Sequence, residues 1–221
     1  MRPLRDRLVD AASDGSLKER AYRTLKRMIL TGELRGGSQV VEAELSKKLK
    51  ISRTPIRESI LQLEHEGLLR VVPYKGIFVA EMSLNDMKDL LQLRFWLERF
   101  AVQEAVSLIT DADLTDMKSL VDQQEQAFRE GDLYQFMELD RQFHLRIAQV
   151  VGNARLLRIL DNLRDQLVAC GLRGLQKRER IAEVLTEHRE VIRGLELRDG
   201  GAATAAMDQH LLKVRDSVLN F

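Results

Sequence analysis

Hydrophobic residues recur at helical spacing along most of this chain, with one short alternating stretch among them. Before residue 82 the pattern predicts three helices and then two strands in LRVVPYKGIFVA, which turn at residues 73–76. From residue 83 onward it predicts six helices joined by short links, with a stop at Gly200 and Gly201. Their expected ranges are 83–108, 111–131, 132–151, 153–171, 177–198 and 202–219. The expected fold class is mainly α, with an all-α helical bundle over residues 83–221.

The stretch ISRTPIRESILQLEHEGLL, residues 51–69, predicts a helix with two different sides. Ser52 is a good N-cap, Pro55 falls in the first turn, and Gly67 fits a helix stop. The positions that share its apolar side are Ile56, Ile60 and Leu63. The positions that share its polar side are Arg53, Thr54 and Arg57. Such a helix can reach phosphates and guanine edges in a DNA major groove; the alternative is a solvated basic face on an ordinary helix.

The neighbouring segments favour DNA binding. VVEAELSKKLK predicts a short helix, and the link over residues 50–52 is too short for anything but a helix-turn-helix. The apolar face of that helix is expected to carry Val41, Leu45 and Leu49. Upstream, LKERAYRTLKRMILTGEL predicts a third helix whose inward residues are Ala21, Leu25, Met28 and Ile29. With the hairpin and its basic tip at Lys75, residues 17–82 predict a winged helix-turn-helix domain.

Charge is split unevenly between the two parts. Residues 1–80 hold 16 Lys and Arg against 10 Asp and Glu, and residues 81–221 hold 19 against 24. A basic first part suggests a polyanion binder joined to a part that does not bind polyanions. The single cysteine, Cys170, excludes an intrachain disulfide and is expected to be a small core residue of a cytoplasmic protein. No apolar run reaches transmembrane length, and residues 1–16 predict a flexible arm without a signal-peptide core.

Asp140 and His144 lie one turn apart in the middle of an apolar helical stripe. The other members of the stripe are Leu133, Phe136, Met137, Ile147 and Val151. A buried carboxylate is costly unless it is paired or bound to a metal. Side chains four residues apart on a helix can ligate one ion, so this pair is a candidate for metal binding.

His188 and His210 lie on the apolar faces of the last two predicted helices. Around His188 the apolar positions are Ile181, Val184, Leu185, Ile192 and Leu195. Around His210 they are Met207 and Val214. Each histidine taken alone is more often a core residue with satisfied hydrogen bonds than a ligand. Three imidazoles and one carboxylate on three helices suit one divalent ion, zinc first, with nickel, iron or manganese as alternatives.

Arg94, in LLQLRFWLERF, lies among apolar residues of the first bundle helix. Those residues are Leu90, Leu91, Leu97 and Ala101. Two interpretations are open: the guanidinium binds the carboxylate of an effector near the metal, or it pairs with Glu98 four residues later.

These motifs together resemble a GntR-family transcriptional regulator of the FadR subfamily. ILTGEL, EAELSKKLKISRTPIRESILQLEHEGLL and PYKGIFVA resemble the family's DNA-binding domain. Asp140-x-x-x-His144, then His188 and His210, matches the metal-binding pattern of its C-terminal FCD ligand domain. RFWLE at Arg94 resembles the first helix of that domain, and six helices rather than seven resemble the VanR branch.

The resemblance implies a homodimer, palindromic operator DNA, and a small organic acid effector near the metal. The expected DNA-binding residues are Ser52, Arg53, Thr54, Arg57, Lys75 and Gly76. Ala43 stands where some members of the family carry an arginine, so their operator sequences do not transfer to this chain.

Three functions remain open at this point. The first is a metabolite-responsive transcription factor, expected to be a repressor controlled by a small carboxylate. The second is a metalloenzyme with a DNA-binding appendage, and the third is a regulator whose metal is purely structural. An enzyme needs a general acid or base near its metal, and the sequence shows no inward carboxylate beyond Asp140. We therefore expect the regulator and no enzymatic activity.

Overall fold

The computed structural model describes residues 16–169 and 178–219. The chain forms two compact units, which are described separately: one runs to Glu81 and also includes Val168 and Ala169, and the other begins at Met82. Cys170, the expected arm over residues 1–15 and the expected helix boundaries at 171 and 177 lie outside the described ranges. Within those ranges, no helix is both long enough and apolar enough to cross a membrane.

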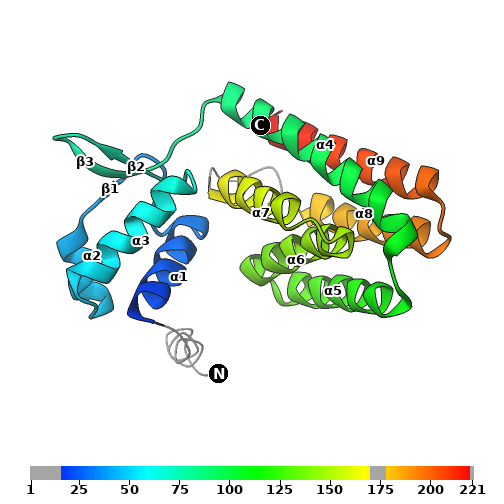
Figure 1. The fold of residues 1–221 in the computed structure, drawn as a ribbon, viewed down its shortest axis with the longest axis horizontal. Helices are drawn as coiled ribbons and strands as arrows, with labels where there is room; N and C mark the ends of the chain where they lie inside the picture. The colour runs from blue at the N-terminus through cyan, green and yellow to red at the C-terminus, as the bar shows by residue number, and fades with distance from the viewer. Residues whose placement is uncertain (1–15, 170–177, 220–221) are drawn as a thin grey trace. The chain divides into compact units, whose positions relative to one another are not determined.

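The first unit combines three helices with a small antiparallel sheet (Figure 1). Its elements are α1 (Leu17–Leu30), β1 (Gln39–Val40), α2 (Glu42–Leu49), α3 (Arg53–His65), β2 (Leu69–Val72) and β3 (Gly76–Val79). Strand β3 pairs with β2 on one side and with β1 on the other. The sequence did not predict β1, because two residues are too few to show alternation. The order of helices and hairpin confirms the winged helix-turn-helix.

The core of the first unit follows the predicted pattern with one exception. Seven predicted core residues are each at most 3% exposed: Ala21, Leu25, Met28, Ile29, Ile56, Ile60 and Leu63. On α2, Leu45 is buried, but Val41 is 38% exposed, so its predicted inward position was wrong. Val41 precedes the helix with an extended backbone, and helical spacing therefore does not apply to it.

Helix α3 begins and ends where the sequence predicts. Ser52 has the extended backbone of an N-cap, although its side chain makes no capping hydrogen bond, and Pro55 lies in the first turn. Gly67 follows the helix with φ of 76°, a left-handed conformation that favours glycine. The amide of Leu68 donates to the carbonyl of Leu63 at 2.9 Å. Local geometry therefore ends the helix here and turns the chain into β2.

The second unit is an all-α bundle whose described residues form six helices, as predicted (Figure 1). They are α4 (Leu84–Leu108), α5 (Asp111–Glu130), α6 (Leu133–Val151), α7 (Ala154–Ala169), α8 (Arg178–Glu196) and α9 (Gly200–Leu219). Helix α4 packs against α6 and α9, α5 packs against α6 and α8, and α8 packs against α9. These contacts close a ring of five helices around a shared interior.

The link between α8 and α9 lies at residues 197–199, before the predicted stop at Gly200 and Gly201. Gly200 and Gly201 do not stop α8; they are the first two residues of α9. The carboxylate of Asp199 accepts a hydrogen bond from the amide of Ala202 at 2.9 Å, so Asp199 caps the new helix. Arg198, with φ of 53°, makes the turn instead of a glycine. The prediction failed because glycine is tolerated in a first helical turn when a good cap precedes it.

Candidate metal centre and DNA-reading surface

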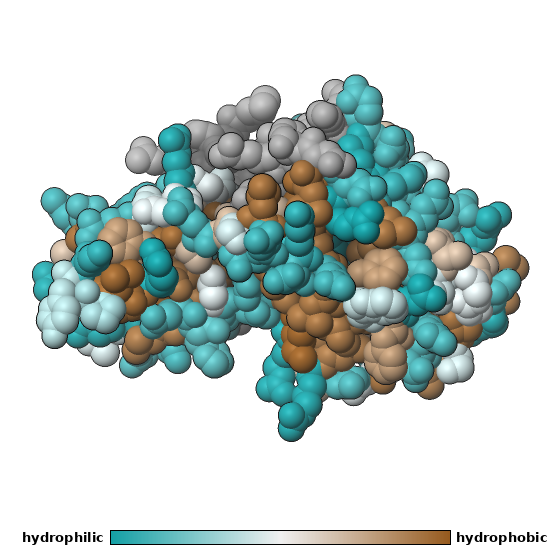
Figure 2. All heavy atoms as spheres, turned by 90° about the horizontal axis from the view of Figure 1, so that it is seen from above, coloured by the Kyte–Doolittle hydropathy of each residue, from teal (hydrophilic) through white to brown (hydrophobic). Residues whose placement is uncertain are grey.

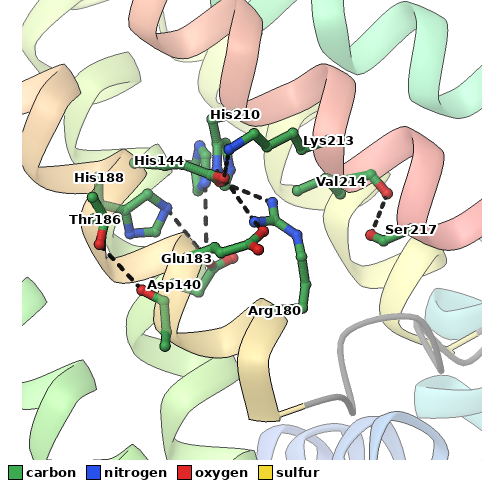
Figure 3. Close-up of polar contacts among 12 residues, drawn as sticks. Asp140, His144, Arg180, Glu183, Thr186, His188, His210, Lys213, Val214 and Ser217 are labelled. Atoms are coloured by element: carbon green, nitrogen blue, oxygen red, sulfur yellow. Dashed lines mark hydrogen bonds and ion pairs between the residues drawn. The ribbon is translucent and has the colours of Figure 1, made fainter.

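Three buried imidazoles meet inside the ring of helices. His144 comes from α6, His188 from α8 and His210 from α9, and each side chain is at most 2% exposed (Figure 3). One ligand atom from each lies within 4.8 Å of the other two. Among the described residues, this is the group of histidine, cysteine and carboxylate side chains close enough to hold one metal ion. The apolar neighbours predicted for His188 and His210 are all buried, which explains why both rings point inward.

Each imidazole is fixed through its Nδ1 atom by a partner on another helix. The three pairs are His144 with Glu98 of α4, His188 with Gln124 of α5 at 3.0 Å, and His210 with Glu187 of α8 at 2.8 Å. An acceptor at Nδ1 holds the ring proton there and leaves the lone pair on Nε2. The Nε2 atoms of His188 and His210 are buried, and the described residues give them no hydrogen-bond partner. This arrangement fits metal ligands, whose second ring nitrogen is usually hydrogen-bonded to an acceptor.

Asp140 lies beside the imidazoles, as Figure 3 shows. Its Oδ1 atom is 3.5 Å from Nε2 of His188 and 4.0 Å from Nε2 of His144, and its Oδ2 atom accepts from Arg164. Burial is the largest single influence on Asp140 and raises its pKa, but Arg164, the two neighbouring imidazoles and Arg94 together lower it by more, so this pKa falls well below its usual value. The carboxylate is therefore ionised, and it lies next to His144 and His188, whereas the group whose ligand atoms all lie within 4.8 Å of one another consists of the three imidazoles. Leu133, predicted on the same stripe, is 39% exposed because it is the first residue of α6.

Burial also sets the charge of the imidazoles. Desolvation lowers the pKa of His188 to about 3, and it lowers the pKa of His144 well below 6.5. Both rings are therefore neutral at physiological pH. Neutral imidazole is the form that ligates a metal.

Arg94 makes the pairing that one of the two interpretations predicted, and its binding of an effector stays a prediction. It is 4% exposed, and its Nε atom donates to Oε1 of Glu98 at 2.5 Å, which is the predicted pairing. Its Nη2 atom also lies 3.3 Å from Nε2 of His144. The guanidinium is thus paired and still directed at the imidazole cluster.

The expectation of no inward carboxylate beyond Asp140 was wrong. Glu98 is 2% exposed and Glu187 is 7% exposed, and each accepts from the Nδ1 atom of a histidine. Glu187 also binds Arg180 through two hydrogen bonds of 2.7 and 2.8 Å. Burial raises the pKa of Glu187, but these partners lower it to about 2. Both carboxylates therefore hold cations and imidazoles in place.

Two further residues of the cluster carried a signal that the sequence reading missed. Gln124 lies in the apolar stripe of α5, and Arg164 lies in that of α7. A polar residue within an apolar stripe is the same signal that identified Asp140. For Glu187 the signal was weaker, because it lies next to His188 and not one turn away.

The first unit presents the predicted DNA-binding residues at its surface. Five are exposed and Gly76 is half-buried; the exposed ones are Ser52, Arg53, Thr54, Arg57 and Lys75. The guanidinium of Arg57 donates to both carboxylate oxygens of Glu42 on α2, at 3.1 and 2.8 Å. This hydrogen bonding lowers the pKa of Glu42. At the wing, Gly76 has φ of 118°, and a Cβ atom there would lie 2.8 Å from Nε2 of Gln39. The turn therefore requires glycine.

A winged helix-turn-helix joined to a separate all-α domain is the architecture of a transcriptional regulator. Residues 17–79 match the model of the bacterial regulatory proteins of the gntR family, and residues 89–213 match that of the FCD domain. The protein belongs to the GntR family of regulators with a C-terminal FCD domain.

Known relatives support this membership. The HTH-type transcriptional repressor RspR of Escherichia coli is 27% identical over 202 residues, which cover 91% of this chain and 89% of RspR. The HTH-type transcriptional regulator McbR of Escherichia coli is 31% identical over 67% of each chain. The solved structure of E. coli McbR/YncC has a TM-score of 0.80 at 23% identity and covers 90% of this chain and 95% of that chain. The relatives are named transcriptional regulators, and the structural match shows a shared fold.

Proposed function

We propose that the protein is a repressor that binds operator DNA as a homodimer and is controlled by a small carboxylate beside a divalent metal ion. The observation that carries this proposal is the set of three buried imidazoles, each held at Nδ1. Two of their Nε2 atoms have no hydrogen-bond partner among the described residues. Burying such atoms unpaired is costly, and a metal ion would satisfy them.

The metal ligands in this proposal are Asp140, His144, His188 and His210. Nitrogen and carboxylate donors of this kind suit zinc, with nickel, iron or manganese as alternatives. Bound there, the ion supplies a cationic anchor for a carboxylate ligand. Arg94 provides a second anchor, because a guanidinium binds a carboxylate through two parallel hydrogen bonds. Its present partner, Glu98, then keeps its contact with His144.

A ligand at this centre contacts several helices of the ring at once. Asp140 and His144 lie on α6, His188 on α8, His210 on α9 and Arg94 on α4. A ligand changes DNA affinity only if it binds two arrangements of the protein unequally. Its contacts with four packed helices give it a way to distinguish such arrangements, and couplings of about 1–3 kcal/mol are typical.

The proposed homodimer has a candidate surface on α4. Leu93, Trp96 and Phe100 are spaced along one face of the helix and are 46%, 58% and 45% exposed. Figure 2, which looks onto the side of the second unit where α4 lies, shows hydrophobic atoms gathered among hydrophilic ones. A second copy of the chain is the occupant that a palindromic operator requires, because two-fold DNA is read by a two-fold protein.

A metalloenzyme remains the second candidate. The inward carboxylates Glu98 and Glu187 give it the acidic groups that the sequence reading had excluded. Both are bound to guanidinium and imidazole groups, which leaves them poorly placed to move protons. The names of the relatives also favour a regulator.

Operator titrations of metal-loaded and metal-stripped protein, with and without a panel of organic acids, test this proposal. Selection of bound DNA from a random library supplies the operator. We expect at least one acid to weaken operator binding by metal-loaded protein and to leave metal-stripped protein unaffected. Chemical conversion of an acid by the metal-loaded protein would favour the enzyme. Unfolding on metal removal, with no response to any acid, would favour a structural metal.

A further inference from the structure

Arg164 is a buried cation whose hydrogen bonds are incomplete. Its side chain is 4% exposed, and only its Nη2 atom makes a hydrogen bond, to Oδ2 of Asp140. Its Nε and Nη1 atoms are buried, and the described part of the chain offers them no hydrogen-bond partner. A guanidinium has five N–H donors, and leaving them unmet in a protein interior costs free energy. Arg164 is therefore ready to bind a further acceptor.

A second buried guanidinium shares a carboxylate with it. Arg94 donates from Nε to Oε1 of Glu98 at 2.5 Å, and Nη1 of Arg164 lies 3.7 Å from the same oxygen. One carboxylate oxygen thus serves two cations. Arg94 also contributes to lowering the pKa of Arg164, after burial itself. The two arginines form a cationic pair beside His144.

The buried charges around the imidazoles balance only in the absence of a metal. The positive charges of Arg94 and Arg164 are offset by the negative charges of Glu98 and Asp140, and the ligating imidazoles are neutral. Glu187 is paired with Arg180 and with the partly exposed Lys213, and the buried Asp165 lies 3.9 Å from the half-buried Arg141. A divalent ion adds two positive charges to this buried site. Uncompensated charge in a protein interior is costly, so a ligand with two negative charges restores the balance.

We infer that Arg164 is a second anion-binding residue of this site and that the ligand is a dicarboxylate. The inference rests on the proposed function and narrows its ligand from carboxylates in general to those with two ionised groups. Arg94 and the metal ion then bind one carboxylate of the ligand, and Arg164 binds the other. The sequence predicted Arg94 as the one effector-binding residue, and a single guanidinium binds a single carboxylate.

Calorimetric titration of the metal-loaded full chain tests the ligand class. The probes are three pairs matched in chain length: malonate and propanoate, succinate and butanoate, glutarate and pentanoate. We expect at least one dicarboxylate to bind ten times more tightly than its monocarboxylate partner. Monocarboxylates that bind as tightly as dicarboxylates in all three pairs would overturn the inference and leave the proposed function standing. If no acid of either class bound or changed operator affinity, the proposed function would fail as well.

A variant locates the second binding group. Arg164→Met should keep its metal, and its ratio of dicarboxylate to monocarboxylate affinity should fall below about threefold. The matched control is Arg141→Met, which removes a half-buried arginine that pairs with Asp161. The control should keep the wild-type ratio. A ratio is informative even in a weakened protein, because general damage lowers both affinities together. If metal-loaded Arg164→Met kept the wild-type ratio of dicarboxylate to monocarboxylate affinity, the role of Arg164 would be overturned. If the variant does not fold, the ratio measured for the wild type still decides the ligand class.

Discussion

The Nε2 atom of His188 lies 3.5 Å from Oδ1 of Asp140, although 48 residues separate them in the chain, and neither side chain is more than 9% exposed. Asp140 is ionised because Arg164 stabilises its charge, whereas His188 is neutral because burial lowers its pKa to about 3. The pair therefore presents a carboxylate oxygen and an imidazole nitrogen to the same point. Because the charge of His188 differs between the folded and unfolded chain at mildly acidic pH, the stability of the protein should depend on pH.

Metal-free protein should lose stability as the pH falls from 7 to 5. The folded-state pKa of His188 is about 3 and that of His144 lies well below 6.5, so below pH 6.5 the unfolded chain binds protons that the folded chain does not. The stability from these two histidines is present above pH 6.5 and is lost as the pH falls toward the folded values. Each contributes a slope of up to about 1.4 kcal/mol per pH unit.

Urea unfolding followed by helix content measures this slope. The lowered pKa values of Asp140 and Glu187 act mainly below the ordinary values of 3.8 and 4.5, and therefore below the window from pH 7 to 5. His188→Gln should reduce the slope by about half. A free energy of unfolding that does not change between pH 7 and 5 would contradict the assigned charge states.

Arg57→Ala should weaken operator binding and relax discrimination at one base pair, by about 1–3 kcal/mol if the contact is bidentate to guanine. In the free protein Arg57 is already held by both oxygens of Glu42, so its fork is oriented before DNA arrives. Lys75→Ala on the wing is the contrasting variant. It should weaken binding to all sequences about equally and reduce the salt dependence, as expected for a phosphate contact. Footprinting titrations at two salt concentrations distinguish the two effects, and unchanged sequence preference in Arg57→Ala would remove Arg57 from the reading surface.

Trp96→Asp should convert the proposed dimer into a monomer. Trp96 is 58% exposed in the middle of the apolar face of α4, and a carboxylate there would have to be desolvated on association. Sedimentation at micromolar concentration measures the change, and operator affinity should fall with it. Tyr134→Asp, at an exposed aromatic residue on α6, is the control and should remain dimeric. A wild-type monomer that binds one per operator would rule out the dimer.

Gly194→Ala should reduce the free energy of unfolding of the second unit by about 1–3 kcal/mol, as overpacking typically does. A Cβ atom at Gly194 would lie 2.5 Å from the backbone nitrogen and Cα of Ala203, so α8 and α9 cannot keep their approach. Gly200→Ala is the matched control, because a Cβ atom there would meet only Val106, at 3.9 Å. Chemical denaturation of both variants measures the difference. Equal stabilities would show that α8 and α9 are not so closely packed.

The sequence predicted the fold well because its signals are local. Helix spacing and the stop at Gly67 act within a few residues, and the structure confirms the elements they define. The failures have the same origin. Residue spacing could not predict β1, because this two-residue strand forms only by pairing with β3. The usual role of glycine as a helix stop could not show that Asp199 caps α9 and that Gly200 is its first residue.

The candidate site was predictable only in part. His144, His188 and His210 could be identified because each interrupts an apolar stripe. Which acceptor fixes each ring depends on how separate helices pack, as when Gln124 of α5 meets His188 of α8. The pairing of Arg164 with Asp140 is likewise a tertiary contact that no periodicity encodes.

The most direct test of the account is the metal content of purified protein, measured by elemental analysis for wild type, His188→Ala and the double variant His144→Ala/His188→Ala. We predict close to one divalent ion per chain in the wild type and a large loss in both variants, with the first unit still folded and still binding operator DNA. A double variant that retains one tightly bound ion per chain, at the affinity of the wild type, would contradict the proposed metal centre.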